Sequence, residues 1–308
     1  MAAFRLAHLS DLHLPMPDRL AAQDVLSKRV LSYISWNRKR RFLHSPDVLA
    51  RVMDDIAAHT PDHVAVTGDI VNLSLKAEFD RSLSWLEKLG TPQNVTVIPG
   101  NHDRLLALQA GAGPDRWQAW SGDETAAIPE FPFVRKRGQI ALIGVNTALP
   151  TAPHLATGRV GEEQAARLHK MLATLGEKNM FRIVLIHHPL GNHAKSARKA
   201  LTDRALVHDA LRVNGAELVL HGHNHRDEFY ATEGPLGPIP VIGVPSASHI
   251  PKNPRYAGGW NLISIEQKEN GWYAHVTARR ITDAMHLETS GQFVLRQPSS
   301  TAALNTAS

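Results

Sequence analysis

Five short clusters of acidic, histidine and glycine residues follow one another along the chain, and together they could bind two divalent metal ions. The clusters are Asp11-Leu12-His13, Gly68-Asp69, Gly100-Asn101-His102-Asp103, His187-His188-Pro189 and Gly222-His223-Asn224-His225. Carboxylate, imidazole and amide groups are donors that Mn, Fe, Zn and Co accept in proteins. Because the chain contains no cysteine, a thiolate-rich zinc site is excluded.

Each cluster follows a short apolar run, which predicts that it lies where a buried strand gives way to a loop. The runs are Phe4–Leu9, Val64–Val66, Val95–Ile98, Ile183–Ile186 and Leu218–Leu220. In open α/β sheets the ligand lies at the carboxyl ends of the strands, so five such clusters can converge on one site. A single Gly-Asp pair or His-x-His motif would be weak evidence for a metal site. The repetition of such clusters at five strand ends is what indicates a site.

The order D-x-H, G-D, G-N-H-D, H-x-P and G-H-x-H resembles the motif series of the binuclear metallophosphoesterase, or calcineurin-like, superfamily. The resemblance spans about residues 4 to 226. It implies a fold of four αββα layers, in which two mixed sheets are flanked by helices. It also implies a first metal bound by Asp11, His13 and His225, a second bound by Asn101, His187 and His223, and Asp69 as the bridging carboxylate.

The activity implied by this resemblance is the hydrolysis of a phosphodiester or pyrophosphate bond. Two metals roughly 3.5–4 Å apart can share a water, lower its pKa and present a bridging hydroxide to the phosphorus. His102 resembles the family's general acid, and Asp103 resembles the carboxylate that orients it. We expect two divalent cations, Mn, Fe, Zn or Co, with Mn favoured.

The other histidines are expected to lie outside the metal shell. His221 should face away from His223 if it ends a strand, because side chains alternate between the two faces. His188, His193 and His249 could line the pocket, although loop rigidity alone would explain the pair of His188 with Pro189. Those with no partner at a recognisable spacing are expected in the core or on the surface: His8, His44, His59, His63, His154, His169, His208, His275 and His286.

Length and periodicity indicate an α/β enzyme domain. The 308 residues, of which 43% are hydrophobic, suffice for one large core. Helical patterns occur at Pro46–Ala58, Leu75–Leu89, Glu162–Leu175 and Ala197–Leu211, and later strands at Pro240–Val244, Trp260–Ile265 and Trp272–Arg279. We expect a single domain over residues 1–290 and a flexible tail over 291–308.

Positive charge gathers in one segment between the first two clusters. Between Asp24 and Asp47 there is no acidic residue, and six basic residues lie there: Lys28, Arg29, Arg38, Lys39, Arg40 and Arg41. They account for more than the whole net charge of +5, so the rest of the chain is close to neutral. A general nucleic-acid-binding surface is therefore not expected.

Residues 25–45 are predicted to form a basic amphipathic insertion, with Leu26, Val30 and Ile34 on one helical face. This composition resembles a helix that binds at a membrane interface. The residues expected to contact a membrane are Lys28, Arg29, Trp36, Arg38, Lys39, Arg40 and Arg41. The apolar face could instead pack on the core, or the cations could receive the phosphates of a substrate.

Two kinds of substrate remain open. A lipid-linked nucleotide such as UDP-diacylglucosamine, cleaved at its pyrophosphate, suits the basic segment, although one enzyme of that branch has Arg where this chain has His102. The alternative is a cyclic nucleotide or a glycerophosphodiester, since soluble phosphodiesterases of the superfamily share the G-N-H-D and H-H-P patterns. A non-catalytic metal-binding scaffold is the remote alternative, because all seven ligand positions and His102 are present.

The sequence has no apolar run near the ~20 residues that a membrane-spanning helix needs. The first strand is expected to begin at Phe4, close to the first residue given, so no signal segment is expected. The expected location is the cytoplasm, with peripheral contact at the inner face of the membrane.

Overall fold

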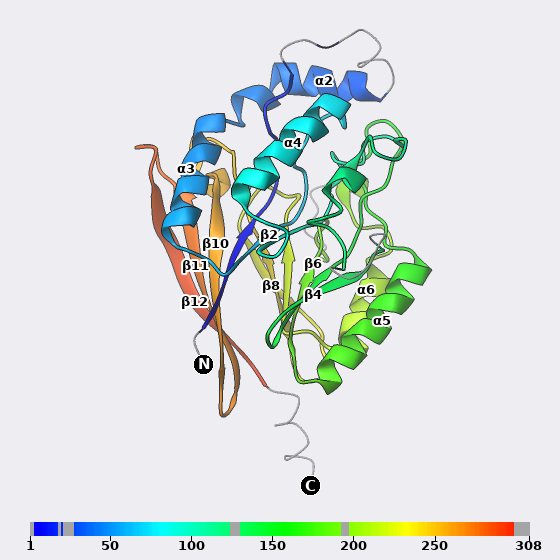
Figure 1. Ribbon diagram of the computed structural model, residues 1–308, viewed down its shortest axis with the longest axis vertical. Helices are drawn as coiled ribbons and strands as arrows, with labels where there is room; N and C mark the ends of the chain where they lie inside the picture. Colours follow the sequence, from blue (N-terminus) through cyan, green and yellow to red (C-terminus); the bar gives the residue numbers. More distant parts are fainter. Residues whose placement is uncertain (1–2, 18–19, 21–27, 124–129, 192–196, 299–308) are drawn as a thin grey trace.

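The computed structural model describes residues 3–17, 20, 28–123, 130–191 and 197–298. Two six-stranded sheets pack face to face, with helices on the outer face of each, so the expected α/β sandwich is confirmed (Figure 1). The first sheet has the order β12 (Leu287–Gln297), β11 (Gly271–Ile281), β10 (Gly259–Lys268), β1 (Phe4–Leu9), β2 (His63–Val66) and β3 (Val95–Val97). The second has the order β4 (Phe133–Arg137), β5 (Ile140–Gly144), β6 (Phe181–Leu185), β7 (Leu218–His221), β9 (Ile239–Gly243) and β8 (Glu228–Thr232).

Strand direction explains why the clusters meet. In the first sheet β1, β2 and β3 run parallel, and in the second β5, β6, β7 and β9 run parallel. Strands of the same direction have their carboxyl ends at one edge of a sheet. The five clusters follow β1, β2, β3, β6 and β7, so they come together at one end of the sandwich.

Apolar side chains on both faces of each sheet form the core. Between the sheets, Leu6 of β1 belongs to the same buried cluster as Leu185 of β6 and Leu220 of β7. Helices α3 (Pro46–Ala58) and α4 (Lys76–Leu89) cover the first sheet, and α5 (Glu162–Glu177) and α6 (Arg204–Asn214) cover the second. Burial of both sheet faces holds the strand ends, and thus the loops that follow them, in fixed positions.

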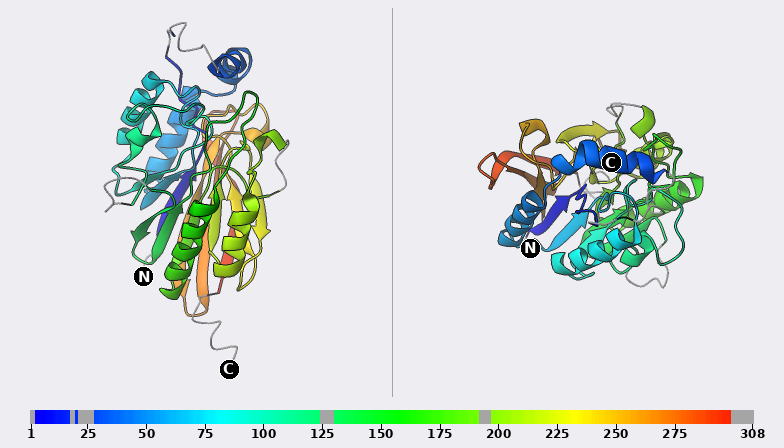
Figure 2. Two further views of the ribbon diagram at one scale, coloured as in Figure 1. Left: turned by 90° about the vertical axis from the view of Figure 1, so that its right-hand side faces the viewer. Right: turned by 90° about the horizontal axis from the view of Figure 1, so that it is seen from above.

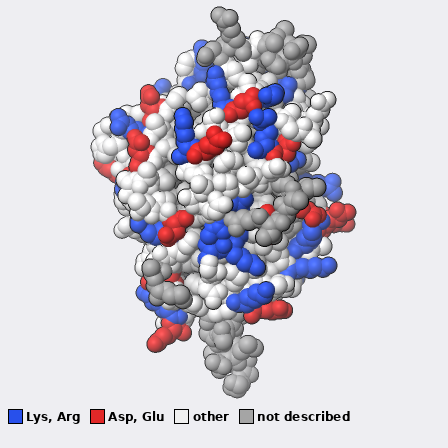
Figure 3. Space-filling view, viewed as in Figure 1, with Lys and Arg blue, Asp and Glu red and all other residues white. Residues whose placement is uncertain are grey.

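The basic segment forms helix α2 (Arg29–Arg38) and the short 3-10 helix η1 (Arg40–Phe42). Seen from above, α2 crosses the end of the sandwich at which the clusters meet (Figure 2). On the face drawn in Figure 3, basic and acidic side chains are interspersed. No helix among the described residues is long and apolar enough to span a membrane.

Several elements differ from the sequence prediction. The helical pattern Ala197–Leu211 is divided into η3 (Ala197–Lys199) and α6, and two further 3-10 helices lie at Pro114–Trp117 and Pro254–Tyr256. Strands β4, β5, β8 and β12 were not predicted. Residues 291–297 were expected to begin a flexible tail, but they pair with β11 in an antiparallel hairpin. The backbone hydrogen bonds to β11 order this segment, and its polar sequence gave no sign of a strand. Residues 299–308, Leu26 and His193 lie outside the described residues, and the single-domain division stays a prediction.

Candidate metal centre

The structure brings the seven predicted donor residues into two adjoining groups. Donor atoms of Asp11, His13, Asp69 and His225 lie within 4.8 Å of one another, and so do those of Asp69, His187 and His223. Asn101 joins the second group, because its Oδ1 lies 3.2 Å from His187 Nε2. The carboxylate of Asp69 belongs to both groups.

Five of the seven residues hold a backbone conformation that L-residues rarely adopt. The φ angles are +54° at Asp11, +44° at His13, +55° at Asp69, +69° at His223 and +51° at His225. Non-glycine residues in this left-handed region are uncommon and concentrate at functional sites, where the surrounding fold maintains the strain. The strained backbone of these loops therefore costs some stability, and it directs the five side chains toward one site.

Two glycines are required by the close approach of the loops. A Cβ on Gly100 would lie 2.7 Å from His187 Cε1 and would also collide with the Asp69 carboxylate. A Cβ on Gly222 would lie 2.5 Å from Asp11 Oδ2 and would overlap the hydroxyl of Ser10. Glycine lets the backbone approach the donors, which accounts for its presence in the clusters.

In the first group, one potential metal-donor atom lies about 3 Å from each of two others. His225 Nε2 lies 3.0 Å from Asp11 Oδ1 and 3.3 Å from His13 Nε2. The buried Asp11 Oδ1 has no hydrogen-bonded partner among the described residues, whereas Asp11 Oδ2 accepts a 2.9 Å hydrogen bond from the backbone N–H of His223. Donors about 3 Å apart, with one buried carboxylate oxygen left free, fit a shared cation with bonds of about 2.1 Å.

In the second group, backbone carbonyls determine which ring nitrogen is free. His187 Nδ1 donates to the carbonyl of Thr67 at 2.7 Å, so its Nε2 faces Asn101 Oδ1 and, at 3.5 Å, Asp69 Oδ2. His223 Nε2 donates to the carbonyl of Lys199 at 3.1 Å, so its Nδ1 faces His187 at 3.2 Å. Hydrogen bonds of this kind to the second nitrogen are typical of metal-binding histidines.

Burial lowers the pKa of some of these groups, and neighbouring charges outweigh burial at others, since Asp69 raises the pKa of His187 to about 9. Burial and the charge of Arg40 hold the pKa of His13 well below its usual range, and burial with nearby His188 does the same to the pKa of His223. Burial opposes ionisation of Asp69, but the charges of His187 and His102 outweigh it and hold its pKa well below the usual range. Neutral imidazoles and an ionised carboxylate are the forms that bind a cation.

His102 lies beside the groups, but its orienting partner differs from the prediction. The ring donates from Nδ1 to the carbonyl of Asn72 at 2.8 Å, and the backbone N–H of His102 donates to Asp69 Oδ1 at 2.7 Å. Burial and the charge of Arg40 lower the pKa of His102 to about 3. Its Nε2 is the nitrogen left to face the site.

Asp103 does not orient His102, so that expectation is wrong. One carboxylate oxygen accepts the N–H groups of Asp69 and Gly100, and the other accepts those of Ile70 and Val71, at 2.8–3.0 Å. Because both oxygens are engaged with backbone donors, the carboxylate joins the loops after β2 and β3 instead of reaching the ring. The adjacency of Asp103 and His102 in the sequence suggested a contact between their side chains. The two side chains instead point in different directions.

The cations of residues 28–44 have different environments. Arg40 Nη2 donates to His13 Nδ1 at 2.7 Å and Arg40 Nη1 to His102 Nε2 at 3.1 Å. Arg29 donates to the carbonyls of Leu73 and Ser74, and Lys28 to Thr151 Oγ1 at 2.6 Å. Arg38, Lys39 and Arg41 are exposed.

Trp36 was expected to contact a membrane, and this expectation is wrong. Its side chain is buried, and its ring is stacked with that of His44 at a centroid separation of 6.3 Å. Arg29 and Arg40 are likewise engaged with the body of the protein and are not presented to a membrane. The exposed apolar residues of this segment are instead Val30, Leu31, Ile34 and Phe42.

Among the remaining histidines, one supports a metal-donor residue, and another lies in a donor group that the sequence did not predict. His188 is buried, bonds to Thr147 Oγ1 at 2.7 Å and packs its ring against His223, so it supports a donor. His221 lies 3.6 Å from Glu228, away from the donor groups as expected. His44 was assigned to the core or surface, but it lies in a group with His13 and His225. Its sequence spacing gives no ligand signal.

Two cavities adjoin the donor groups. One of about 310 Å³ is lined by Asp69, Asn101 and His102 together with the cations Lys28, Arg40 and Lys199. The other, of about 690 Å³, lies on the side of His13 and is lined both by apolar and aromatic side chains, such as Leu49 and Trp36, and by polar ones, such as Arg41 and His44. The polar cavity suits a phosphate, and the larger one, with both polar and apolar walls, suits an aromatic or amphipathic group.

The family model for calcineurin-like phosphoesterases matches residues 4–227. A protein named as a probable cyclic nucleotide phosphodiesterase from Synechococcus sp. is 22% identical over 274 residues, which cover 88% of this chain and 91% of that protein.

Solved structures resemble the fold. A dimetal phosphatase from Danio rerio superposes with a TM-score of 0.62 at 11% identity, covering 96% of this chain and 99% of that one. The purple acid phosphatase PPD1 from yellow lupin seeds gives a TM-score of 0.61 at 13% identity, covering 96% of this chain and 54% of that one. At these identities the likeness concerns the fold alone.

Proposed function

The chain belongs to the calcineurin-like phosphoesterase family of metal-dependent phosphoester hydrolases, and within that family we propose that it cleaves a lipid-linked nucleotide at its phosphodiester or pyrophosphate bond. The observation that carries the chemistry is the pair of donor groups that share Asp69, with His102 beside them. When bound, two divalent cations would activate a water as nucleophile and neutralise charge on the phosphoryl oxygens. Mn is our first choice, since carboxylate and amide oxygens suit it.

Different residues of the protein would bind the cations, supply the proton and maintain the loops. Asp11, His13 and His225 would bind one cation, Asn101, His187 and His223 the other, and Asp69 both. His102 would supply the proton for the leaving group from Nε2, with its ring orientation set by the carbonyl of Asn72; Nε2 must first take up this proton, because here it accepts a hydrogen bond from Arg40 and the pKa of the ring is about 3. Asp103 would act only by maintaining the loops that carry Asp69 and Asn101.

Arg40 supports a phosphate-binding role for the basic segment. Its guanidinium reaches His13 and His102 and lines the polar cavity with Lys28 and Lys199. A guanidinium can donate two parallel hydrogen bonds to a phosphate. We propose that Arg40 binds a phosphoryl oxygen of the substrate.

The lipid part of the proposal comes from α2 and the larger cavity. The side chains of Val30, Ile34 and Phe42 are 37%, 40% and 56% exposed, so the apolar residues face outward rather than packing on the core. Exposed Arg38, Lys39 and Arg41 flank them, as in helices that bind anionic membranes. The larger cavity beside His13, whose wall combines polar and apolar side chains, would accept the part of the lipid next to the reacting phosphate.

A cyclic nucleotide is the second candidate substrate. It is favoured by the 22% identical relative, which is named as a probable cyclic nucleotide phosphodiesterase. Tyr33 and Trp36 in the cavity wall could pack against a nucleobase as well as against an acyl chain.

The test is the initial rate of the Mn-loaded protein on UDP-diacylglucosamine in detergent micelles and on cyclic AMP, with UMP and AMP as the detected products. Faster UMP release supports the lipid-linked nucleotide. Faster AMP release would make the protein a soluble-substrate phosphodiesterase. Hydrolysis of neither substrate, in protein that holds both metals, would favour the non-catalytic scaffold.

A further inference from the structure

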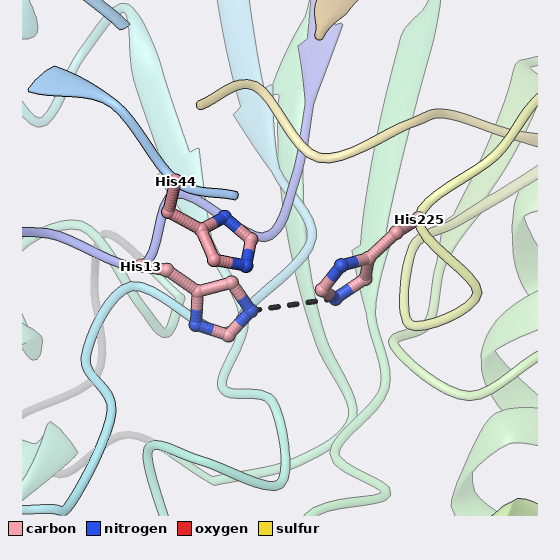
Figure 4. A group of neighbouring side chains, drawn as sticks. All are labelled: His13, His44 and His225. Carbon is pink, nitrogen blue, oxygen red and sulfur yellow. Dashed lines mark hydrogen bonds between the residues drawn. The ribbon is translucent and has the colours of Figure 1, made fainter. Parts of the chain in front are cut away.

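His44 is a buried imidazole directed at the first donor group. Its side chain is 7% exposed, and one of its ring nitrogens lies within 4.8 Å of donor nitrogens of His13 and His225. The ring centroid is 4.5 Å from that of His13 and 5.6 Å from that of His225. Figure 4 shows the three rings around one space, each from a different segment of the chain.

The position of His44 is held by the backbone on both sides. The N–H of Ser45 donates to the carbonyl of Ser248 at 2.8 Å, and the N–H of Ile250 donates to the carbonyl of Leu43 at 2.9 Å. These bonds attach the end of the basic segment to the loop after β9, beside an isolated bridge between His44 and His249. Trp36 stacks on the ring. A residue fixed in this way has little freedom to turn away from the site.

A chain of hydrogen bonds selects the tautomer of His44. Ser246 Oγ donates to the carbonyl of Asp11 at 2.6 Å, so its only proton is used there. The 3.3 Å contact between Ser246 Oγ and Ser248 Oγ then needs the Ser248 proton. A proton on Nδ1 then satisfies both the 2.9 Å contact of His44 Nδ1 with Ser248 Oγ and its 3.3 Å contact with Ser246 Oγ. Nε2 is left with a free lone pair, and among the described residues it has no hydrogen-bonded partner.

We propose that His44 is a further nitrogen ligand of the first cation, beside His13 and His225. The inference rests on the proposed metal centre but not on the identity of the substrate. A metal-binding histidine usually donates its other N–H to a neighbouring acceptor, as Nδ1 of His44 does to Ser248. The serine chain that ends at Asp11 thus links two ligands of the same ion.

This ligand would make the two metal positions chemically different. The first ion would receive nitrogens from His13, His44 and His225 as well as the carboxylates of Asp11 and Asp69. The second would receive two imidazoles and the oxygens of Asn101 and Asp69. Since imidazole nitrogen favours Zn and Fe over Mn, the first position should retain Zn or Fe more strongly than the second.

The test is cobalt substitution of the intact protein, followed by proton NMR of hyperfine-shifted exchangeable signals. Each coordinated histidine whose second nitrogen carries a proton contributes one signal, so four are expected, from His44, His187, His223 and His225; His13 Nδ1 accepts from Arg40 and contributes none. Three signals in protein that holds two Co ions would overturn the proposal. This count needs no variant, so it does not depend on a substitution being tolerated.

A variant then assigns the extra signal. His44→Ala should lose one signal, change the visible absorption of one Co ion, and weaken binding of that ion by at least about tenfold, and added imidazole should restore the absorption. His249→Ala is the matched control, because His249 is also buried and lies 5.9 Å from the His44 ring without belonging to the group. An unchanged spectrum and affinity in His44→Ala would contradict the assignment. Four signals, one of them lost in His44→Ala, without any hydrolysis would support it while overturning the proposed function.

Discussion

Asp69 and His102 touch each other but serve different steps, and this difference can be measured. Asp69 contributes a carboxylate to both donor groups, whereas His102 contributes only its backbone N–H to that carboxylate and keeps its ring outside the groups. A residue that binds the metals and a residue that supplies a proton should therefore fail in different ways when removed.

Asp69→Ala should lose bound metal and activity together, because neither cation would keep its shared ligand. His102→Ala should retain both metals but lose roughly 10²–10⁴-fold in rate on a substrate with a poor leaving group. On a nitrophenyl ester the loss should be much smaller, since nitrophenolate scarcely needs a proton. Metal content and the two rates check this, and equal losses on both substrates would contradict the assignment of His102.

Arg40→Ala should lower kcat/KM by about 10- to 100-fold, equivalent to the ~1.5–3 kcal/mol of a hydrogen bond to a charged group. Metal content should be unchanged, because Arg40 is not a ligand. Arg38→Ala is the matched control, since it removes the same charge from the same segment at an exposed position. Steady-state kinetics check the prediction, and similar losses in the two variants would indicate a general charge effect.

Helix α2 is an element whose apolar side faces solvent. Amphipathic helices of globular proteins ordinarily bury the apolar side, but here Val30 and Ile34 are exposed while Trp36 faces the protein. The helix is positioned by Arg29, which donates to the carbonyls of Leu73 and Ser74 in the loop that follows β2. This orientation places Arg40 in the site and leaves the apolar residues for a partner outside the chain.

Ile34→Glu should reduce binding to vesicles that contain anionic lipid, because it places a charge where apolar contact is proposed. The measurement is sedimentation of the protein with vesicles at low and high salt. Val213→Glu, an equal change at an exposed apolar residue of α6, is the matched control and should leave binding unchanged. Equal binding by both variants and the unaltered protein would remove the membrane role.

The whole molecule contains buried histidines remote from the donor groups, and these link its stability to pH. His63 begins β2, is fully buried, and its Nε2 contacts Thr96 Oγ1 at 2.7 Å. Burial, and then the charges of Arg137 and Arg135, lower the pKa of His63 to about 3. The unfolded chain takes up this proton near pH 6.5, so the contribution of His63 is complete above that pH and is lost as pH falls toward 3.

Acidification of the metal-free protein from pH 7.5 to 5 should therefore lower the free energy of unfolding, with a His63 contribution on the order of 2 kcal/mol. His63→Gln should show a pH dependence smaller by that amount, even if it is less stable at both values. Urea unfolding at the two pH values checks this. An identical pH dependence in the variant would show that His63 does not titrate as described.

The sequence determined the donor residues and the ends of the elements that carry them. Strand β1 and helix α3 have the predicted bounds, and Asp11, Asp69 and His187 each follow a strand as expected. These predictions depend on signals within about ten residues, such as an apolar run that ends in a polar cluster, and local signals are readable without the fold. Edge strands such as β8 and β12 gave weaker signals because only their partners in the sheet complete their hydrogen bonds.

Only the tertiary structure decided which groups contact each other across long stretches of chain. His102 turned toward the carbonyl of Asn72, Asp103 toward the backbone N–H groups of residues 69–71, and His44 toward His13 and His225. Each contact joins residues that no sequence spacing relates, because the geometry arises from two sheets packed together and from a segment crossing their end. The kind of donor atom that each residue offers follows from its type and can be read from the sequence. The hydrogen-bond partners of these residues depend on where the packed strands place the backbone.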